Sequence, residues 1–302
     1  MPTRHAVSVS LGSSKRDKKV TVRFGDTDVI IERIGTDGDV EAAKRLYREL
    51  DGKVDAFGMG GVDLYIRVGD KEYPLRAAHK LIEGVHKTPV VDGRGLKHTL
   101  ERRVFELAAP NLREKDLHFK RAFMPLALDR VGLAHAVEEV ADEIIFGDFM
   151  VGLGIPMPIR GLKAYERWLH LLMPIVSYFP LSMLFYGSGG GEGEPKFEKY
   201  WESADLIAGD FMFMKKYMPP HMLKGKFIIT NTTTAENLEF IRAHGVRVLI
   251  TTTPRYEGRS FGTNMMEAAL TAYAGKGRRL TYDEINSLID ELDFRPTVHY
   301  FD

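Results

Sequence analysis

The stretch FKRAFMPLALD, Phe119 to Asp129, decides the fold of this sequence. Its first six residues are mostly apolar, as in a buried strand, and the helical pattern LAHAVEEVA, Leu133 to Ala141, follows it. A second apolar run, EIIFGD, ends at Asp148. Short apolar strands that alternate with helices are typical of a parallel sheet with helices on both faces. This strand–helix–strand unit therefore predicts an α/β protein.

The same alternation continues to the C-terminus. Apolar runs that predict strands stand at SMLFYG (Ser182 to Gly187), DLIAGD, KFIITNT and VRVLITTTP. Helical patterns separate them, and the last helix, LTYDEINSLIDELDF, begins with Thr281 and Glu284 at capping-box spacing. We therefore expect a C-terminal Rossmann-like domain that has a mostly parallel sheet with helices on both faces.

The N-terminal third of the chain predicts a second α/β lobe. It opens on the alternating strand AVSVSLG, and it contains two hairpin patterns and helical patterns at residues 40–50, 77–86 and 96–107. The polar segment APNLREKDLHFK separates this part from the next. We place the boundary there, with an N-terminal α/β domain with hairpins in residues 1–115 and the C-terminal domain in residues 116–302. The predicted fold class is thus α/β with two Rossmann-like lobes.

The composition excludes several classes of protein. Lys+Arg and Asp+Glu both number 42 among the 302 residues, so the chain lacks the net positive charge of a general nucleic-acid binder. It has no cysteine, which rules out disulfides and thiolate metal sites and fits a cytoplasmic protein. Pro174 and Pro180 interrupt the apolar stretch from Trp168 to Tyr186. We interpret that stretch as a buried helix followed by a strand, and we expect no membrane contact.

Ligands of open parallel sheets bind beyond the carboxyl ends of the strands. In the C-terminal domain, Asp129 and Asp148 follow predicted strands and are candidate catalytic residues. Candidate ligand-binding residues at the same ends are Asn231, Thr232, Thr251 and Thr252. The alternative, β-propensity and helix capping, explains about half of these threonines. The motif Gly-Asp-Phe-Met occurs twice, at Asp148 and Asp210, and we interpret it as a shared way of ending a strand, with Asp148 the better candidate for function.

The loop TTTPRYEGRSFGTNMMEA is a candidate anion site. It places Arg255, Arg259, Ser260 and Thr263 beside a predicted helix that begins near Asn264. A helix N-terminus offers free N–H groups and partial positive charge, so a carboxylate or a phosphate would suit this loop. The alternative is an exposed loop whose arginines face solvent.

Three segments of the N-terminal domain carry further candidates. The candidate binding residues are Ser10, Gly12, Ser13, Ser14, Gly58 and Gly60. The two last glycines permit close approach of a ligand to the backbone. Asp92 and Lys97 lie near the start of a predicted helix, and an aspartate and a lysine in one cleft can relay a proton. An N-cap aspartate and a solvated lysine explain the same pattern.

Several well-known motifs are absent from the sequence. No stretch matches the dinucleotide fingerprint G-x-G-x-x-G, the Walker phosphate loop, H-E-x-x-H or G-x-S-x-G. His79 and His86 lie two turns apart on a predicted helix, but no third ligand is evident, so we expect no metal there. A magnesium site formed by Asp129, Asp148 and Asp210 stays open as an alternative, because all three residues end predicted strands.

Across nearly its whole length, the chain resembles a group of bacterial proteins labelled quinate 5-dehydrogenase. The shared motifs are VSLGSSKRD, ERIGTDGD, TPVVDGRGLKHTLERR, the GDF and TNT strand ends, and TTTP followed by GRSFGTN. The resemblance implies an enzyme that uses NAD or NADP to oxidise a ring hydroxyl of quinate or shikimate to a ketone.

We therefore expect an NAD(P)-dependent oxidoreductase that acts on a quinate- or shikimate-like hydroxy acid. The substrate carboxylate would lie beside Arg255 and Arg259, or at the turn formed by Ser13 and Ser14, which we call the serine turn. Asp129, Asp92 or Lys97 would transfer the proton. The alternatives are a magnesium-dependent enzyme on a phosphorylated or nucleotide substrate, and a non-catalytic small-molecule-binding protein whose two lobes close on a ligand. The expected partner is a small molecule, with a homodimer as an option.

Overall fold

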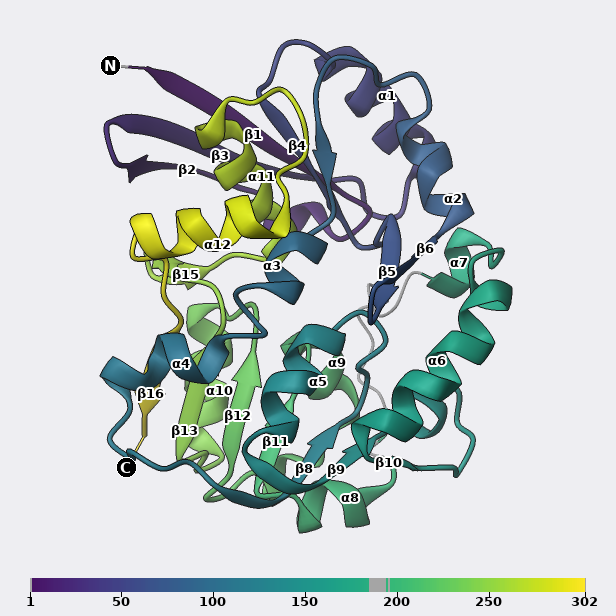
Figure 1. Ribbon diagram of the computed structural model, residues 1–302, viewed down its shortest axis with the longest axis vertical. Helices are drawn as coiled ribbons and strands as arrows, with labels where there is room; N and C mark the ends of the chain where they lie inside the picture. The colour runs from purple at the N-terminus through teal and green to yellow at the C-terminus, as the bar shows by residue number, and fades with distance from the viewer. Residues whose placement is uncertain (1, 185–193, 195, 302) are drawn as a thin grey trace. The chain divides into compact units, whose positions relative to one another are not determined.

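The structure, a computed structural model, describes residues 2–184, 194 and 196–301 and divides into two compact units. Unit 1 comprises residues 1–99, 172–189 and 262–294, and unit 2 comprises residues 100–171, 190–261 and 295–302. Each unit has a sheet of mostly parallel strands flanked by helices (Figure 1), so the predicted α/β class is confirmed. We describe each unit by itself.

The sheet of unit 1 has the strand order β2-β3-β1-β4-β7. Its strands are β1 (Thr3–Ser10), β2 (Lys18–Phe24), β3 (Thr27–Gly35), β4 (Ala56–Gly60) and β7 (Val90–Val91). All run parallel except β2, which forms the predicted hairpin with β3. The second predicted hairpin, β5 (Tyr65–Val68) and β6 (Lys71–Pro74), is a separate two-stranded sheet.

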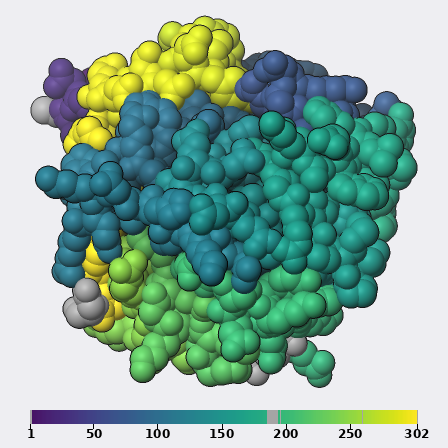
Figure 2. Space-filling model, turned by 60° about the horizontal axis from the view of Figure 1, so that its bottom comes forward, coloured from purple at the N-terminus to yellow at the C-terminus, as the bar shows by residue number. Residues whose placement is uncertain are grey.

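The helices of unit 1 come from three separate parts of the chain. They are α1 (Val40–Leu50), α2 (Arg76–His79), α3 (Arg94–His98), α7 (Leu181–Leu184), α11 (Thr263–Ala274) and α12 (Tyr282–Glu291). α11 packs against β1, β3 and β4. The ring of Phe24 contacts those of Tyr273 and Phe294 edge to face, which places the C-terminal helices (yellow) beside N-terminal residues (purple) in Figure 2. Thr281 and Glu284 form the predicted capping box of α12.

Two glycines let α11 approach its own unit closely. A Cβ at Gly58 would lie 2.7 Å from the backbone oxygen of Asn264, and a Cβ at Gly93 would lie 2.7 Å from the backbone nitrogen of Asn264. Gly93 also has φ +94°, a left-handed conformation that favours glycine. The close backbone approach expected at Gly58 is therefore made by a helix of the same unit.

The sheet of unit 2 has the strand order β10-β9-β8-β11-β12-β13-β16. Its strands are β8 (Phe119–Met124), β9 (Ala141–Phe146), β10 (Ile159–Arg160), β11 (Leu206–Ala208), β12 (Phe227–Thr230), β13 (Val248–Thr251) and β16 (Thr297–Tyr300). The five central strands run parallel and the two edge strands antiparallel. The chain leaves β8 toward β9 on one side and returns to β11 on the other. The topological switch point, where doubly wound sheets bind ligands, therefore lies between β8 and β11.

Helices cover the sheet of unit 2 and enclose its core. They are α4 (Val104–Ala108), α5 (Val131–Glu138), α8 (Glu198–Ser203), α9 (Phe211–Tyr217) and α10 (Ala235–Ala243), while α6 (Leu162–Val176) begins in unit 2 and ends in unit 1. One buried cluster joins Phe123 and Ile228 of the strands to Trp201 of α8 and Phe211 of α9. This core fixes the strand ends on which the site described below depends.

The division of the chain differs from the one that the sequence predicts. The first unit boundary falls after Thr99 rather than after residue 115, and residues 262–294 return to unit 1. The physical reason is that α11, buried on nearly every side, packs on the N-terminal sheet. The helix predicted at residues 96–107 is two short helices, α3 and α4, which lie in different units.

The interpretation of Trp168 to Tyr186 as a buried helix followed by a strand is wrong for the residues described. α6 exposes Trp168, Leu171 and Ile175, and Ser182 to Leu184 belong to the helix α7. Pro180 precedes α7, and proline favours the start of a helix. The rest of the predicted strand, with Tyr186 and Gly187, lies outside the described residues. In the part of the chain that the structure describes, no helix combines the length and the apolar composition that a membrane span needs.

Candidate functional site

Three polar residues stand side by side at the carboxyl edge of the sheet in unit 2. β11, β12 and β13 pair in parallel register, so the residues that follow these strands lie at matching levels. By this register Asp210, Asn231 and Thr252 are level with one another. Because β11 borders the switch point, these residues lie where the fold predicts a ligand.

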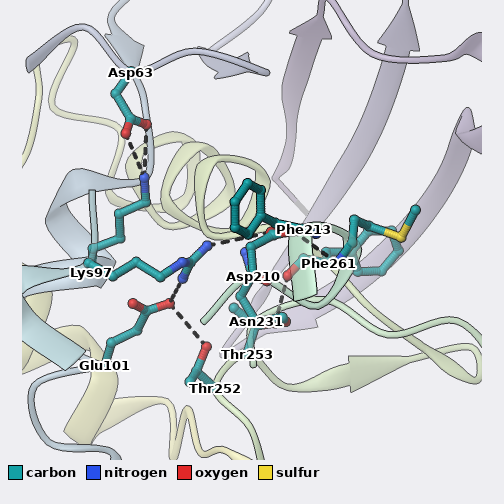
Figure 3. Close-up of polar contacts among 11 residues, drawn as sticks. Asp63, Lys97, Glu101, Asp210, Phe213, Asn231, Thr252, Thr253 and Phe261 are labelled. Atoms are coloured by element: carbon teal, nitrogen blue, oxygen red, sulfur yellow. Dashed lines mark hydrogen bonds and ion pairs between the residues drawn. The ribbon is translucent and has the colours of Figure 1, made fainter. Parts of the chain in front are cut away.

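Arg130 lies at the switch point, between the loop after β8 and the start of α5. Its Nη1 donates a hydrogen bond to Oε1 of Glu101 at 2.6 Å, and its Nη2 lies 3.6 Å from Oδ2 of Asp210. The hydroxyl of Thr252 donates to the same Oε1 of Glu101 at 3.3 Å (Figure 3). We call Glu101, Arg130, Asp210, Asn231 and Thr252 the switch-point cluster.

The switch-point cluster is mostly buried and carries unequal charges. The side chains of Glu101 and Arg130 are 0% and 4% exposed, whereas that of Asp210 is 39% exposed. Two carboxylates therefore share one guanidinium, which leaves one net negative charge when all three groups are ionised. Buried charges lose their hydration and need partners of good geometry, which the Glu101–Arg130 pair supplies. Asp210 is the end of this network that solvent reaches.

The side chain of Asn231 adds an unused acceptor to the cluster. Asn231 is 6% exposed, and its Oδ1 is buried without a hydrogen-bond partner among the described residues. Its backbone oxygen accepts a hydrogen bond from Oγ1 of Thr253 at 2.8 Å. An unmade hydrogen bond at a buried polar atom costs about 1–3 kcal/mol, so such atoms are uncommon. In the described part of unit 2 the side-chain hydroxyls of Thr230 and Thr251 share this property.

Asp148 holds the loop after β8 in place. Its Oδ1 accepts hydrogen bonds from the N–H groups of Ala127 and Leu128, at 3.1 and 2.9 Å, and from the hydroxyl of Tyr165 at 2.9 Å. The second oxygen, Oδ2, is buried without a partner among the described residues. Burial raises the pKa of Asp148 to about 7, against the smaller opposing effect of these hydrogen bonds. The carboxyl group thus ties β8 to β9 from inside the protein.

The raised pKa of Asp148 predicts a pH-dependent stability. Between about pH 4 and pH 7 the folded state holds a proton that the unfolded state releases, so the free energy of unfolding falls as pH rises. Asp148→Asn keeps the acceptor oxygen but does not titrate. As pH rises across that window, the free energy of unfolding of this variant should increase relative to that of the wild type by about 1 kcal/mol per pH unit. Urea unfolding at pH 5, 6 and 7 measures the difference, with Asp116→Asn at an exposed position as the control. Parallel curves for wild type and Asp148→Asn would contradict it.

The two Gly-Asp-Phe-Met aspartates have different roles. Oδ1 of Asp210 caps α9, since it accepts hydrogen bonds from the N–H groups of Met212 and Phe213. Its Oδ2 faces Arg130 at the switch point. Asp148 instead is enclosed by its own loop. The geometry therefore favours Asp210, rather than Asp148, as the aspartate that contacts a ligand. The third candidate, Asp129, is half-buried in the loop after β8, directly before Arg130.

The threonine triplets and the arginine loop mostly serve the fold of unit 2. Thr251 and Thr252 are fully buried, and Thr232 is half-buried. Arg255 donates a hydrogen bond to the backbone oxygen of Gly258 within its own hairpin, β14 (Arg255–Tyr256) and β15 (Arg259–Ser260). The buried hydroxyl of Ser260 accepts a hydrogen bond from the N–H of Thr233 at 2.7 Å.

The predicted anion site is divided between the two units. Arg255 and Ser260 belong to unit 2 and Thr263 to unit 1, and the side chain of Arg259 lies outside the described part. The structure therefore gives no single unit that contains the whole set.

The serine turn of unit 1 is occupied by its own hydrogen bonds. Oγ of Ser10 accepts from the N–H of Gly12 at 3.1 Å and from Nη2 of Arg33 at 3.0 Å. Ser13 caps the 3-10 turn that begins at Ser14. A Cβ at Gly60 would lie 2.7 Å from the side chain of Ser10, so this glycine makes room for the serine.

Asp92 and Lys97 do not form the expected pair. Oδ2 of Asp92 accepts hydrogen bonds from the N–H groups of Leu64 and Tyr65, at 2.7 and 3.2 Å, and the N-cap residue of α3 is Gly93, so the N-cap alternative is also wrong. Nζ of Lys97 donates to both carboxylate oxygens of Asp63, at 2.8 and 2.9 Å (Figure 3). Lys97 is buried, so its ion pair with Asp63 is better shielded from water than a surface pair.

No group of three or more His, Cys, Asp or Glu side chains among the described residues is arranged to hold a metal ion. Asp148 is enclosed by backbone amides, and Asp210 caps a helix and faces an arginine. The magnesium alternative, which needs the strand-end aspartates to converge on one ion, therefore has no support in these contacts.

Sequence reasoning missed the two residues at the centre of the cluster. Arg130 follows a predicted strand beside Asp129, so its position at a strand end was a usable signal. Glu101 carries no comparable signal, because it looks like one of several charges in LKHTLERRVFEL. Only the burial of Glu101, which is 0% exposed, distinguishes it from the other charged residues of this segment.

The fold and cluster describe an α/β protein with a doubly wound sheet in unit 2. The chain belongs to a family described as "Domain of unknown function (DUF8754)", whose family model matches residues 95–301. A second family model, "Domain of unknown function (DUF8753)", matches residues 5–92. A comparison with curated proteins found no match.

Three solved structures are similar to the whole chain at low identity. A glucose-galactose binding protein from Geobacillus stearothermophilus has 11% identity over 100% of this chain and 98% of its own, with a TM-score of 0.39. An NAD-dependent malic enzyme from Thermotoga maritima has 10% identity over 95% and 84%, with a TM-score of 0.35. A periplasmic solute binding protein from Actinobacillus succinogenes with bound D-allose has 10% identity over 100% and 98%, with a TM-score of 0.36. These scores carry no inference about ligand or activity.

Proposed function

We propose that unit 2 binds a small, neutral, polyhydroxylated molecule, such as a sugar or a cyclitol, at the switch-point cluster. The observation that carries this proposal is the unused, buried Oδ1 of Asn231, level with Asp210 at the carboxyl edge of the sheet. A ligand hydroxyl is the simplest group that fits there, because it both donates and accepts hydrogen bonds.

The donors and acceptors of the cluster match a row of hydroxyl groups. Asp210 and Asn231 offer acceptor oxygens, and Arg130 holds the carboxylate of Asp210 in place beside them. A ligand hydroxyl that donates to Oδ1 of Asn231 would satisfy the buried atom and could accept from a neighbouring group at the same time. The binding site of a polar small molecule has this composition, with a few convergent polar groups on a rigid frame.

The charge of the cluster argues against an acidic ligand at this place. Arg130 already faces the carboxylates of Glu101 and Asp210. A third carboxylate would meet a net negative charge in a mostly buried setting, where like charges repel more strongly than in water. The quinate-like acid that the resemblance implies is therefore a poorer match for unit 2 than a neutral polyol.

A thermal-shift panel of neutral sugars, cyclitols and hydroxy acids tests the proposal. A ligand at a hundredfold excess over Kd stabilises the folded state by about 2.7 kcal/mol. We expect at least one neutral polyol to stabilise the wild type and Asn111→Leu, which changes an exposed asparagine of the same unit. The same polyol should not stabilise Asn231→Leu. Stabilisation of Asn231→Leu equal to that of the wild type would refute the assigned site.

A second candidate function is the NAD(P)-dependent oxidation of a quinate- or shikimate-like acid. The buried Lys97–Asp63 pair in unit 1 favours it, because a lysine and a carboxylate in contact can transfer the proton of a substrate hydroxyl. The sequence, however, has no glycine fingerprint after β8.

Nicotinamide absorbance decides this second candidate. Quinate or shikimate with NAD or NADP should reduce the cofactor at a rate that Lys97→Met abolishes and Lys163→Met leaves unchanged. Absence of cofactor reduction with every acid and cofactor combination would remove the candidate.

A further inference from the structure

A cavity of about 310 Å³ lies at the amino ends of the strands of unit 2, opposite the switch-point cluster. Its lining comes from the residues at or just before the starts of β8, β11, β12 and β13. Figure 1 shows α8 at this end of the sheet, and Figure 2 turns this end toward the reader. A cavity of this size can hold a small molecule.

The cavity is rich in positive charge. Four basic residues line it, Lys120, Lys224, Lys226 and Arg247, against two acidic residues, Glu202 and Asp205. The whole chain has zero formal net charge, so this local excess is not a reflection of composition. A basic recess raises the local concentration of anions.

Lys226 is the buried basic residue of this cavity, which we call the basic recess. It is 9% exposed, and its Nζ donates to the backbone oxygens of Glu202 and Ala204, at 2.8 and 2.6 Å. These carbonyls end α8, so Lys226 offsets the partial negative charge of that helix end. An ammonium group has three N–H donors, and no third acceptor for Lys226 is found in the described ranges. One donor thus remains for a ligand.

The other three cations are not needed for this capping. Lys120 and Lys224 are exposed, and in the described part of the chain neither has an ion-pair partner. Nη1 of Arg247 lies 3.3 Å from Oε1 of Glu114, with both side chains partly exposed. Such a partly exposed pair contributes little to stability, so a ligand can replace it at little cost.

The acidic lining residues do not cancel this excess. Oδ2 of Asp205 accepts a hydrogen bond from the N–H of Arg121 at 3.0 Å, which directs that oxygen to the backbone. Glu202 is exposed at the end of α8. The lining residues therefore carry an excess of two positive charges, and Glu114 pairs with one of them.

We propose that this recess binds a phosphate group, either as inorganic phosphate or as part of a small phosphorylated molecule. A phosphate dianion meets this positive excess, and its oxygens accept charge-assisted hydrogen bonds from ammonium and guanidinium groups. The site lies at the opposite ends of the strands from the switch-point cluster. It is therefore independent of the ligand proposed there and gives unit 2 a second binding site.

The test is a titration of the full chain with inorganic phosphate at pH 8, in which the melting temperature is measured at each concentration. Chloride keeps the ionic strength constant throughout. Constant ionic strength is required because salt screens surface charges. Phosphate should raise the melting temperature above that in chloride. In Lys120→Gln/Lys224→Gln, the apparent Kd for phosphate should rise about tenfold, as expected for the loss of two exposed charge contacts.

The matched control removes two exposed lysines of unit 2 that do not line the recess, in Lys115→Gln/Lys163→Gln. This variant should bind phosphate with the wild-type affinity. A wild type that phosphate stabilises no more than chloride does would overturn the proposal. Equal loss of affinity in the two double variants would also overturn it, because the effect would then come from net charge alone.

Discussion

Glu101→Ala is expected to lower the free energy of unfolding by about 3–5 kcal/mol, because it leaves the buried guanidinium of Arg130 without its closest carboxylate. The remaining carboxylate, Asp210, lies 3.6 Å away and is partly exposed. Thr252 would lose its acceptor as well. Chemical denaturation of wild type and variant measures this loss. Glu106→Ala, which breaks an exposed ion pair with Arg103, is the control and should change stability by about 0–1 kcal/mol.

A double variant separates the charge from the volume of Glu101. Glu101→Leu/Arg130→Met removes both buried charges and keeps apolar groups of similar size, so it should recover most of the stability that Glu101→Ala loses. It should also abolish any binding of a polyol. If the double variant is as unstable as Glu101→Ala, the loss comes from packing rather than from an uncompensated charge.

Gly93→Ala is expected to lower the free energy of unfolding of unit 1 by about 2–5 kcal/mol, as the sum of left-handed strain and overpacking. Gly93 has φ +94°, and its Cβ would lie 2.6 Å from Oγ1 of Thr263 and 2.7 Å from the backbone nitrogen of Asn264. The start of α11 would have to move away from the loop after β7. Urea unfolding measures the effect.

Gly38 provides a control that isolates the overpacking. It has φ +89°, and a Cβ there would meet nothing within 4 Å. Gly38→Ala should therefore show only the strain of the left-handed conformation, about 1–2 kcal/mol. Equal losses for the two variants would mean that α11 yields without cost and that its contact with Gly93 does not stabilise unit 1.

The sequence predicts most elements of the fold because their signals are local. The strand–helix–strand pattern from Phe119 to Asp148, the two hairpins and the capping box of α12 are all present in the structure. The sharing of helices between units is not local. The apolar pattern of α11 does not indicate that it packs on β1 and β4, both of which lie far earlier in the chain.

The candidate site is predictable only in part, for the same reason. Asn231 and Thr252 follow apolar strands, so their place at the carboxyl edge can be read from the sequence. The choice between Asp148 and Asp210 depends on which backbone amides surround each carboxylate. The partner of Lys97 is Asp63 rather than Asp92 for a similar reason, because the loop after β4 occupies Asp92.

Calorimetric titration with a matched pair of ligands tests the central claim most directly. Quinate and its uncharged amide share the same hydroxylated ring and differ in one carboxylate, so the amide serves as the neutral cyclitol. If the switch-point cluster holds a neutral polyol, the cyclitol should bind about tenfold more tightly or better, a difference of about 1.4 kcal/mol. Asp210→Asn keeps an N-cap residue for α9 and removes one negative charge. It should therefore reduce the difference in affinity between the neutral cyclitol and the acid. Tighter binding of the acid by the wild type, or no binding of any neutral polyol, would contradict the account.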